Sequence, residues 1–311
     1  MPQFDGLLLC DKPYRLSSHD VINNLRRTIQ QKKIGHTGTL DPRATGLLIT
    51  CLGRATKLSQ FLGDADKTYL AEITLGKKSS TYDSEGILEN SESPVPRITR
   101  KQLDEILDNF RGKIKQKVPA FSAVKVDGKR LYKLARSGKE VETPIRDIEI
   151  KELVIEDLDL PVIRCRVTCT KGTYIRSLAN DIGETLGCGG YLSNLRRTKV
   201  GNFDISNALT LDEIKNLHAA RELERHIVPI ESALTYPSIM VTKEFTEHVI
   251  TGRTPQFTDL IAIEGEFNVD QVVSLKDYQG KIMAIGRAQK NSDEINENET
   301  NIFFKYVRVL N

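Results

Sequence analysis

A glycine-rich stretch near the N-terminus restricts the possible fold of this chain more than any other feature of the sequence. Residues 35–46 read GHTGTLDPRATG, with three glycines and one proline. A helix does not tolerate this density of glycine and proline, so the stretch is expected to form a shaped loop between regular elements. Its acid, Asp41, stands directly before Pro42, which restricts the backbone of Asp41 to extended conformations.

This loop carries side chains that could do chemistry. Glycines let a ligand approach the backbone closely, and loops hold binding and catalytic residues disproportionately often. A functional role for Asp41 and His36 is therefore reasonable. An Asx turn at Asp41 and a surface or packed histidine at position 36 explain the same residues equally well, and spacing alone does not decide between the two.

Regular elements are expected on both sides of the loop. Apolar runs and alternating patterns predict strands, over residues 6–10, 47–52, 68–76, 146–155 and 162–170. Helical spacing predicts helices over 19–29, 54–62, 100–110, the segment from Gly172 to Gly187, and 211–226. Three of these helices begin with capping-box pairs, which are Ser17–Asp20, Thr99–Gln102 and Thr210–Glu213.

The length of 311 residues and a change of pattern near residue 236 predict two domains. Residues 1–232 are expected to form the larger domain, and the short strands and turns of 236–311 a small all-β domain. Within the larger domain, the segment 113–145 is dense in lysine and arginine and predicts an exposed insertion.

Charge is divided unevenly between the two parts. Residues 235–311 carry 8 basic and 11 acidic side chains, whereas the residues before them carry 37 basic and 31 acidic ones. The positive excess weakly favours a polyanionic partner for the longer part. On charge alone, a mixed solvated surface is the simpler explanation.

The sequence disfavours several classes of protein and several kinds of functional site. The five cysteines form no CxxC pair and no zinc-type spacing, which fits reduced thiols in a cytosolic protein. No run approaches the roughly 20 apolar residues of a membrane helix, and no signal peptide is recognisable, so a soluble protein is expected. The P-loop, dinucleotide and HExxH motifs do not occur, which disfavours nucleotide-driven, nicotinamide and ordinary zinc chemistry.

The order of several motifs resembles that of the bacterial TruB-type tRNA pseudouridine synthases. In the family's order, these motifs occupy residues 11–13, 35–46, 53–57, 118–125, 128–132 with 135–138, 171–176, and 195–198. The matches span about residues 6–203. So many matches in one order do not arise by chance.

The resemblance implies a fold and an activity. The implied fold is α/β (α+β), with a mixed, largely antiparallel sheet flanked by helices and a small C-terminal β-barrel of the PUA-like kind. The implied reaction converts the T-loop uridine at position 55 of tRNA to pseudouridine, by flipping the base, breaking the glycosidic bond and rejoining the base through carbon. Because this isomerisation involves no net redox change, no cofactor is expected. A cytoplasmic monomer that binds the T arm of tRNA, without metal or membrane, is expected.

The resemblance also assigns catalytic residues. It makes Asp41 the essential nucleophile or acid–base group, Arg176 the arginine that contacts it, and Tyr69 the active-site tyrosine. Mechanisms for the family differ on whether this aspartate attacks the base, attacks the sugar or removes a sugar proton. A carboxylate in a water-poor pocket needs a paired cation to stay ionised, and the planar, permanently charged guanidinium of arginine suits that task.

Further residues acquire binding roles by resemblance. His36 is implied to help hold the target nucleoside, Tyr174 and Leu195 to line the base pocket, and Lys12 to lie near the active centre. A core leucine and a solvated lysine in a turn are the ordinary explanations for the last two. The basic stretch 113–139 and the pair Arg196–Arg197 are candidates for phosphate contacts.

Two residues depart from the family pattern. Arg15 stands where the family usually has glycine, which bears on the turn next to Lys12. Arg43 replaces the usual apolar residue between Pro42 and Ala44, where it could reach an RNA phosphate or alter the packing of the loop.

Two other functions are compatible with parts of the sequence. A non-catalytic RNA-binding module would keep the fold and leave uridine unchanged. A metal-dependent hydrolase could use acidic and imidazole side chains, namely His36, Asp41, Asp83 and Glu85. A chelator would abolish the activity of such a hydrolase, whereas the isomerase needs no metal.

Overall fold

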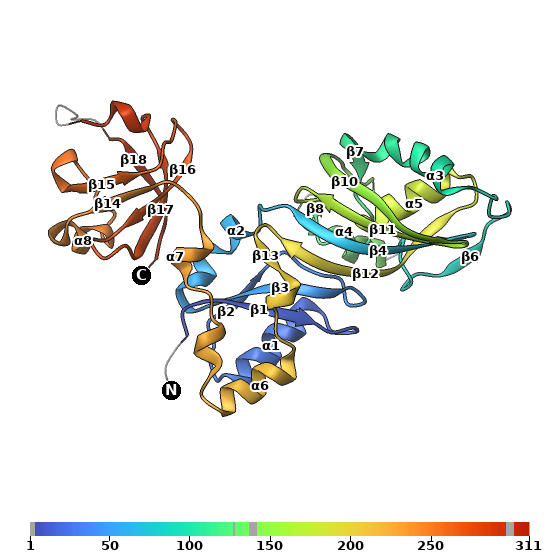
Figure 1. The fold of residues 1–311 in the computed structure, drawn as a ribbon, viewed down its shortest axis with the longest axis horizontal. Helices are drawn as coiled ribbons and strands as arrows, with labels where there is room; N and C mark the ends of the chain where they lie inside the picture. The colour runs from blue at the N-terminus through green and yellow to red at the C-terminus, as the bar shows by residue number, and fades with distance from the viewer. Residues whose placement is uncertain (1–3, 127, 137–141, 297–301, 311) are drawn as a thin grey trace.

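A nine-stranded mixed sheet runs through the larger part of the computed structural model, which describes residues 4–126, 128–136, 142–296 and 302–310 (Figure 1). Its strand order is β1 (Gly6–Lys12), β3 (Thr45–Leu52), β12 (Gly190–Val200), β4 (Lys67–Leu75), β11 (Val162–Cys169), β10 (Ile145–Asp159) and β7 (Gly112–Lys117). Two short strands extend it, β2 (Ile34–Thr37) on β3 and β13 (Phe203–Asp204) on β12. The expected α/β architecture with a largely antiparallel mixed sheet is confirmed.

One parallel junction divides this sheet into two halves. β3 and β12 pair only at Arg196 with Thr45 and at Arg197 with Gly46, whereas the other pairs of strands are antiparallel. The half that contains β1, β2 and β3 packs against α1 (Ser18–Thr28) and α6 (Leu211–Ala219). The half that contains β4, β10 and β11 packs against α3 (Arg100–Leu107) and α5 (Ile175–Thr185). Each half therefore has its own apolar core.

The helix starts follow the capping signals in the sequence. The boxes at Ser17, Thr99 and Thr210 are all formed, each with its side chain and backbone bonds in both directions. Helix ends differ from expectation. The segment 54–62 forms a 3-10 turn, η1 (Gly53–Leu58), and then a short α2 (Ser59–Leu62). The expected helix 211–226 ends at Ala219, and Arg221 takes a left-handed backbone conformation (φ 62°) before the 3-10 turn η4 (Leu223–His226).

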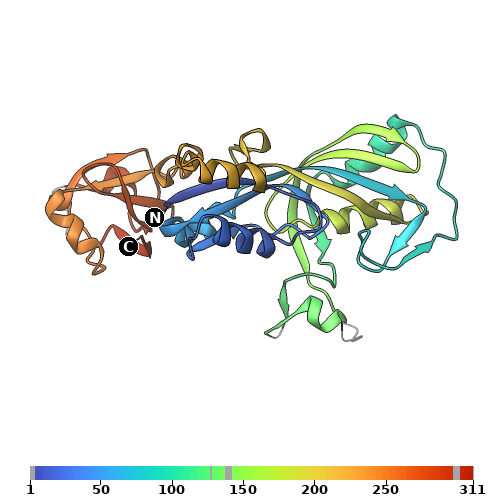
Figure 2. The ribbon, with the colours of Figure 1, turned by 90° about the horizontal axis from the view of Figure 1, so that it is seen from below.

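The basic segment 113–145 is only partly an insertion. Its first residues form β7, which pairs with β10 at the edge of the main sheet, so the expectation was wrong for them. Lysines alternate with Ile114 and the buried Gln116 along β7, and this alternation is the strand signal that the high charge obscured. The described residues that follow, 119–126, 128–136 and 142–143, project from the body as a small lobe with β8 (Lys125–Val126), β9 (Lys129–Arg130) and α4 (Leu131–Arg136) (Figure 2). Residues 127 and 137–141, part of the basic stretch, lie outside the described residues.

A five-stranded sheet forms the C-terminal part of the described chain. Its order is β15 (Leu260–Glu264), β14 (Ser238–Val241), β16 (Val272–Lys276), β17 (Ile282–Ala288) and β18 (Phe304–Val309). The sheet confirms a second, strand-rich unit, but a helix, α8 (Lys243–Val249), accompanies it and buries Phe245 and Val249. The expectation of an all-β unit missed this helix because seven residues give little periodicity.

The two sheets share apolar contacts. The short α7 (Ile230–Ala233) lies beside the expected domain boundary. Its Ile230 packs in one cluster with Leu7 and Ile49 of the large sheet and with Ile282 and Leu310 of the C-terminal part. The domain limits 1–232 and 236–311 stay a prediction. Every helix in the described ranges is too short or too polar to cross a lipid bilayer.

Candidate active site

The glycine-rich stretch forms the last pairs of β2, a loop over residues 38–44, and the start of β3. β2 and β3 pair through His36 with Thr50 and Thr37 with Ile49, so the loop leaves the sheet at the parallel junction. At Gly46 (φ 102°), an added Cβ would lie 2.3 Å from the carbonyl oxygen of Arg197. This glycine is therefore required for β3 and β12 to approach each other.

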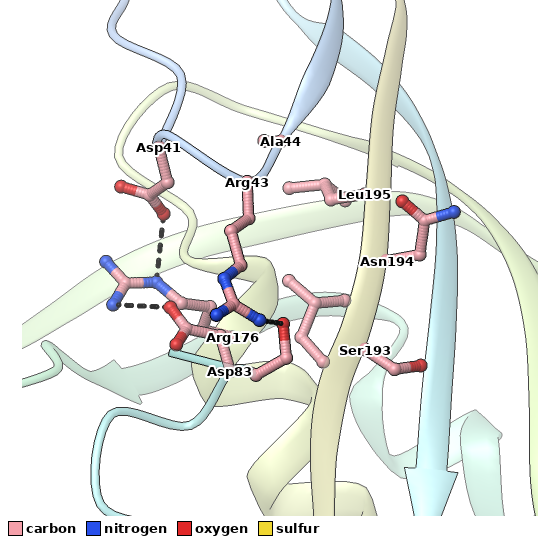
Figure 3. A pocket seen from close by; sticks show the side chains of 10 residues that line it. Asp41, Arg43, Ala44, Asp83, Arg176, Ser193, Asn194 and Leu195 are labelled. Carbon is pink, nitrogen blue, oxygen red and sulfur yellow. Dashed lines mark hydrogen bonds and ion pairs between the residues drawn. The ribbon is translucent and has the colours of Figure 1, made fainter. Parts of the chain in front are cut away.

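Folding brings together the two residues on which the expected chemistry depends. The side chain of Asp41 projects from the loop, and that of Arg176 projects from the first turn of α5. The Nε of Arg176 lies 3.0 Å from Oδ2 of Asp41 (Figure 3). The Arg176 side chain is only 8% exposed, whereas that of Asp41 is 45% exposed. A largely buried cation thus faces a carboxylate that remains open to a ligand.

A second carboxylate, Asp83, helps to fix Arg176. Its Oδ2 lies 3.3 Å from Nη1 of Arg176, and the guanidinium also donates to the carbonyl oxygens of Thr81 at 3.3 Å and Phe121 at 3.1 Å. The guanidinium thus has four acceptors in fixed places, so its orientation toward Asp41 is set by the surrounding backbone. Sequence reasoning placed Asp83 only in the hydrolase alternative, because nothing local to residue 83 indicates an arginine partner 93 residues later.

These charges line a pocket. Figure 3 shows Asp41, Asp83 and Arg176 on one side and residues of β12, including Leu195, on the other. Arg43 and Ala44 complete the loop side of the lining. The free volume is about 20 Å³, which admits about one water molecule. Leu195 lines this pocket on the side of β12.

Tyr69 lies beside the pocket lining rather than in it. It stands on β4 opposite Arg197 of β12, and its ring packs in one cluster with Leu40, Ala44 and Leu195. Burial raises the pKa of the Tyr69 phenol. The phenol therefore stays protonated near neutral pH and is suited to donating a hydrogen bond or a proton rather than to accepting one as a base.

The expectation that Arg197 contacts phosphate was wrong. This side chain is 1% exposed, and it donates from Nε to the carbonyl oxygen of Leu47 at 2.8 Å and from Nη2 to that of Gly38 at 3.0 Å. The alternation of β12 turns position 197 inward. Its guanidinium therefore supports the loop over residues 38–44, the active loop, through these hydrogen bonds. Arg196 points the other way and makes two bonds to the carboxylate of Asp11, at 3.1 and 2.6 Å.

Lys12 is buried and also supports the loop that carries Asp41. Its side chain is fully buried, and Nζ donates to the carbonyl oxygens of Pro13 at 3.1 Å, Leu16 at 2.5 Å and Pro42 at 3.1 Å. The backbone N–H of Arg15 also donates to Pro42, at 2.9 Å. Arg15 has φ 69°, the left-handed conformation that glycine adopts most easily. The turn next to Lys12 therefore takes a glycine-like conformation although its residue is arginine.

Lys12 gives the first testable prediction, a pH dependence of stability. Burial lowers the pKa of Lys12 from 10.5 to about 8. Between these values the unfolded chain holds a proton that the folded chain has released, so the free energy of unfolding rises with pH across this window. Across this pH window, the free energy of unfolding of the wild type should rise by on the order of 2 kcal/mol relative to that of Lys12→Met. Denaturant unfolding of both proteins at several pH values measures the difference, and parallel curves would contradict the prediction.

His36 and Tyr174 are not among the pocket-lining residues. Burial, and then the nearby Arg197 cation, lower the pKa of His36, so its imidazole is neutral near pH 7. Its Nδ1 is buried and makes no hydrogen bond within the described part of the chain. Tyr174 precedes α5, and the side chain of Gln116 holds its backbone through bonds of 2.8 and 3.0 Å. Gln116 thereby fixes the start of the helix that carries Arg176.

The two carboxylates of the site, Asp41 and Asp83, both pair with Arg176. Within the described ranges, no three His, Cys, Asp or Glu side chains gather closely enough to hold a metal ion. Asp41 and Asp83 instead face the same guanidinium. This arrangement counts against the hydrolase alternative.

Solved structures with the same fold are known. The chain superposes on a chain of the crystal structure of a Cbf5-Nop10-Gar1 complex with a TM-score of 0.78 and 24% identity, covering 98% of this chain and 85% of that one. A structure of an H/ACA RNP bound to a substrate RNA containing 2'-deoxyuridine gives a TM-score of 0.77 at 22% identity, with 98% and 85% covered. At this identity the likeness shows the fold alone.

Sequence relatives narrow the class to one family. The family model described as TruB family pseudouridylate synthase (N terminal domain) matches residues 26–175, and that of the tRNA pseudouridylate synthase B C-terminal domain matches 176–235. The tRNA pseudouridine synthase B of Clostridium kluyveri is 42% identical over 80% of this chain and 84% of its own length. That of Bacillus cereus is 42% identical over 80% and 83%.

The chain belongs to the TruB family of pseudouridylate synthases. Pseudouridine synthases are isomerases, and so is this protein. The resemblance found in the motif order is thereby confirmed.

Proposed function

We propose that this protein converts the T-loop uridine at position 55 of tRNA to pseudouridine, with Asp41 as the essential catalytic group. The observation that carries the proposal is the contact of 3.0 Å between Asp41 and the buried guanidinium of Arg176 at the wall of a pocket. The names of the relatives, which are tRNA pseudouridine synthases, support tRNA as the substrate.

Asp41 acts in its ionised form in this proposal. A carboxylate can attack carbon or accept a proton only when it is charged, and the charge must survive when the substrate displaces water from the pocket. Arg176 stabilises that charge, and Asp83 with two backbone carbonyls holds Arg176 in place. Both are therefore assigned to the reaction, Arg176 in contact with the catalytic carboxylate and Asp83 as a positioning residue.

The other expected site residues are assigned to holding the nucleoside. Leu195 would pack against the flipped base from β12, and Tyr69 would stack on it or donate a proton. His36 would contact the nucleoside with its free Nδ1, and Tyr174 would approach it from the start of α5. Lys12 would act indirectly, because its three hydrogen bonds hold the loop that carries Asp41.

The projecting lobe is assigned to RNA binding. It exposes several cations, which are Lys125, Lys129, Arg130 and Lys133. Turning a stacked uridine outward costs a few kcal/mol, and contacts between such cations and phosphates supply binding free energy that offsets this cost. We assign the T arm of tRNA as the bound element, and the acidic C-terminal part to a local contact at most.

The oligomeric state, the location and the domain organisation complete the proposal. The protein acts as a monomer, in the cytoplasm, where its substrate is made and used. Its domains are 1–232 and 236–311, which the end of the second family match at residue 235 and the start of β14 at Ser238 support. We assign the second domain to the PUA-like class.

Mapping of pseudouridine in RNA tests the proposal. Total RNA from cells with and without this protein should differ at the T-loop uridine of tRNA, and purified protein should restore the modification in vitro without a cofactor. A chelator should leave the rate unchanged, whereas a metal-dependent hydrolase would lose its activity. Binding of tRNA with no change in uridine would indicate the non-catalytic RNA-binding module instead.

A further inference from the structure

Arg43 is the residue of the active loop that the reaction described above leaves without a role. It lies two positions after Asp41 and lines the same pocket. In Figure 3 its side chain extends from the loop between the charges around Arg176 and the residues of β12. Nη1 donates to Oγ of Ser84 at 3.0 Å, and Nε lies 3.9 Å from Oε1 of Glu85. Arg43 therefore joins the two loops that border the pocket.

Arg43 is held far more weakly than the other arginines of the site. Its side chain is 42% exposed, and its ion-pair partner Glu85 is 41% exposed, so the pair contributes little to stability. Arg176 and Arg197, in contrast, are buried, and apart from Asp41 their acceptors are backbone carbonyl oxygens and the buried carboxylate of Asp83. Of these three guanidinium groups, that of Arg43 can move at the smallest cost.

The pocket needs such a movement before it can receive a nucleobase. A free volume of about 20 Å³ admits a water molecule and no pyrimidine ring. Leu192 to Leu195 belong to a strand of the central sheet, and Asp83 and Arg176 are fixed to each other. The long, half-exposed side chain of Arg43 is the part of the lining that can leave without breaking the sheet or the buried charge network.

We propose that Arg43 partly closes the pocket in the free protein and, when uridine enters, exchanges Ser84 and Glu85 for a phosphate group of the same RNA. The inference rests on the proposed function, because it takes RNA as the substrate. The planar fork of a guanidinium binds phosphate through two parallel hydrogen bonds, which a hydroxyl and a distant carboxylate do not match. The exchange thus couples opening of the pocket to the arrival of a polyanion.

The test measures kcat and KM for a T-arm hairpin at several salt concentrations. Each phosphate contact contributes about 0.7–0.9 to the slope of log(kcat/KM) against log salt concentration. Arg43→Leu should reduce that slope by this amount and lower kcat/KM by about 3- to 10-fold through KM, with kcat within about 3-fold of the wild type. The matched control is Arg225→Leu, at an exposed arginine of η4 that does not line the pocket, and it should leave the slope and KM unchanged.

A second variant tests the exchange itself. Ser84→Ala removes the hydrogen bond that holds Arg43 over the pocket while keeping the positive charge. It should lower KM by about 2- to 5-fold and leave the salt slope unchanged, because the released guanidinium is free to bind phosphate. An unchanged or raised KM for Ser84→Ala would overturn the exchange.

The remaining outcomes separate this inference from the proposed function. A salt slope for Arg43→Leu equal to that of the wild type, or a fall in kcat alone, would overturn the phosphate contact. A wild type that forms no pseudouridine would refute the proposed function itself, whereas an active wild type with an unaltered slope in Arg43→Leu refutes only the role of Arg43. If Arg43→Leu fails to fold, as judged by thermal melting, Arg43→Gln is measured by the same criteria.

Discussion

Asp41→Asn is expected to abolish pseudouridine formation, with kcat reduced by at least about 10³-fold. The amide has nearly the same shape as the carboxylate but can neither attack carbon nor accept a proton as a base. Arg176 keeps its contacts with Asp83 and two carbonyl oxygens, so the pocket should remain assembled and RNA binding should stay within about 3-fold. Single-turnover formation of pseudouridine and a separate binding titration with the same T-arm hairpin measure the two effects.

The control for this substitution is Asp159→Asn. Asp159 is exposed at the end of β10 and does not line the pocket, so the same chemical change should leave turnover and binding unaltered. Turnover that persists in Asp41→Asn would remove this carboxylate from the reaction. It would also remove the basis for assigning Arg176 to catalysis.

Arg176→Lys is expected to lower kcat by about 100-fold or more while KM changes by less than about 3-fold. One ammonium group cannot contact two carboxylates and two carbonyl oxygens in the places that the guanidinium now occupies. Buried acceptors would lose their partners, and Asp41 would lose the cation that stabilises its charge. Steady-state kinetics with the T-arm hairpin separate the two parameters.

An exposed arginine supplies the control here as well. Arg166 lies on β11 and pairs with Glu152 and Glu156 at the surface, where a lysine can replace it with little effect. Arg166→Lys should therefore match the wild type in both parameters. A raised KM with an unaltered kcat in Arg176→Lys would assign Arg176 to RNA binding instead of to the catalytic pair.

Local signals in the sequence predicted much of the fold. The capping boxes at Ser17, Thr99 and Thr210 place helix starts correctly because the bonds they form join residues three positions apart. The glycines and Pro42 likewise predict the active loop, since backbone conformation there depends on the residues themselves. Helix ends were less predictable, because the left-handed break at Arg221 is set by neither glycine nor proline.

Contacts between distant segments could not be predicted in this way. Arg197 looked like a surface cation, and only the pairing of β12 with β3 and β4 turns it into a buried brace. The contact of Asp83 with Arg176 and the three bonds of Lys12 also depend on how loops meet in space. The resemblance to a family supplied the pairing of Asp41 with Arg176, which spacing along the chain could not supply.

The parallel junction between β3 and β12 has a consequence for how the protein loses activity. Asp41 arrives from one half of the large sheet and Arg176 from the other, and only two residue pairs join the central strands there. Leu40 and Ala44, which lie near Asp41 in the loop, pack in the core of that other half. The ion pair therefore depends on how this loop docks across the junction. A misalignment too slight to melt either core is sufficient to pull the ion pair apart, so inactivation by heat or denaturant should precede global unfolding.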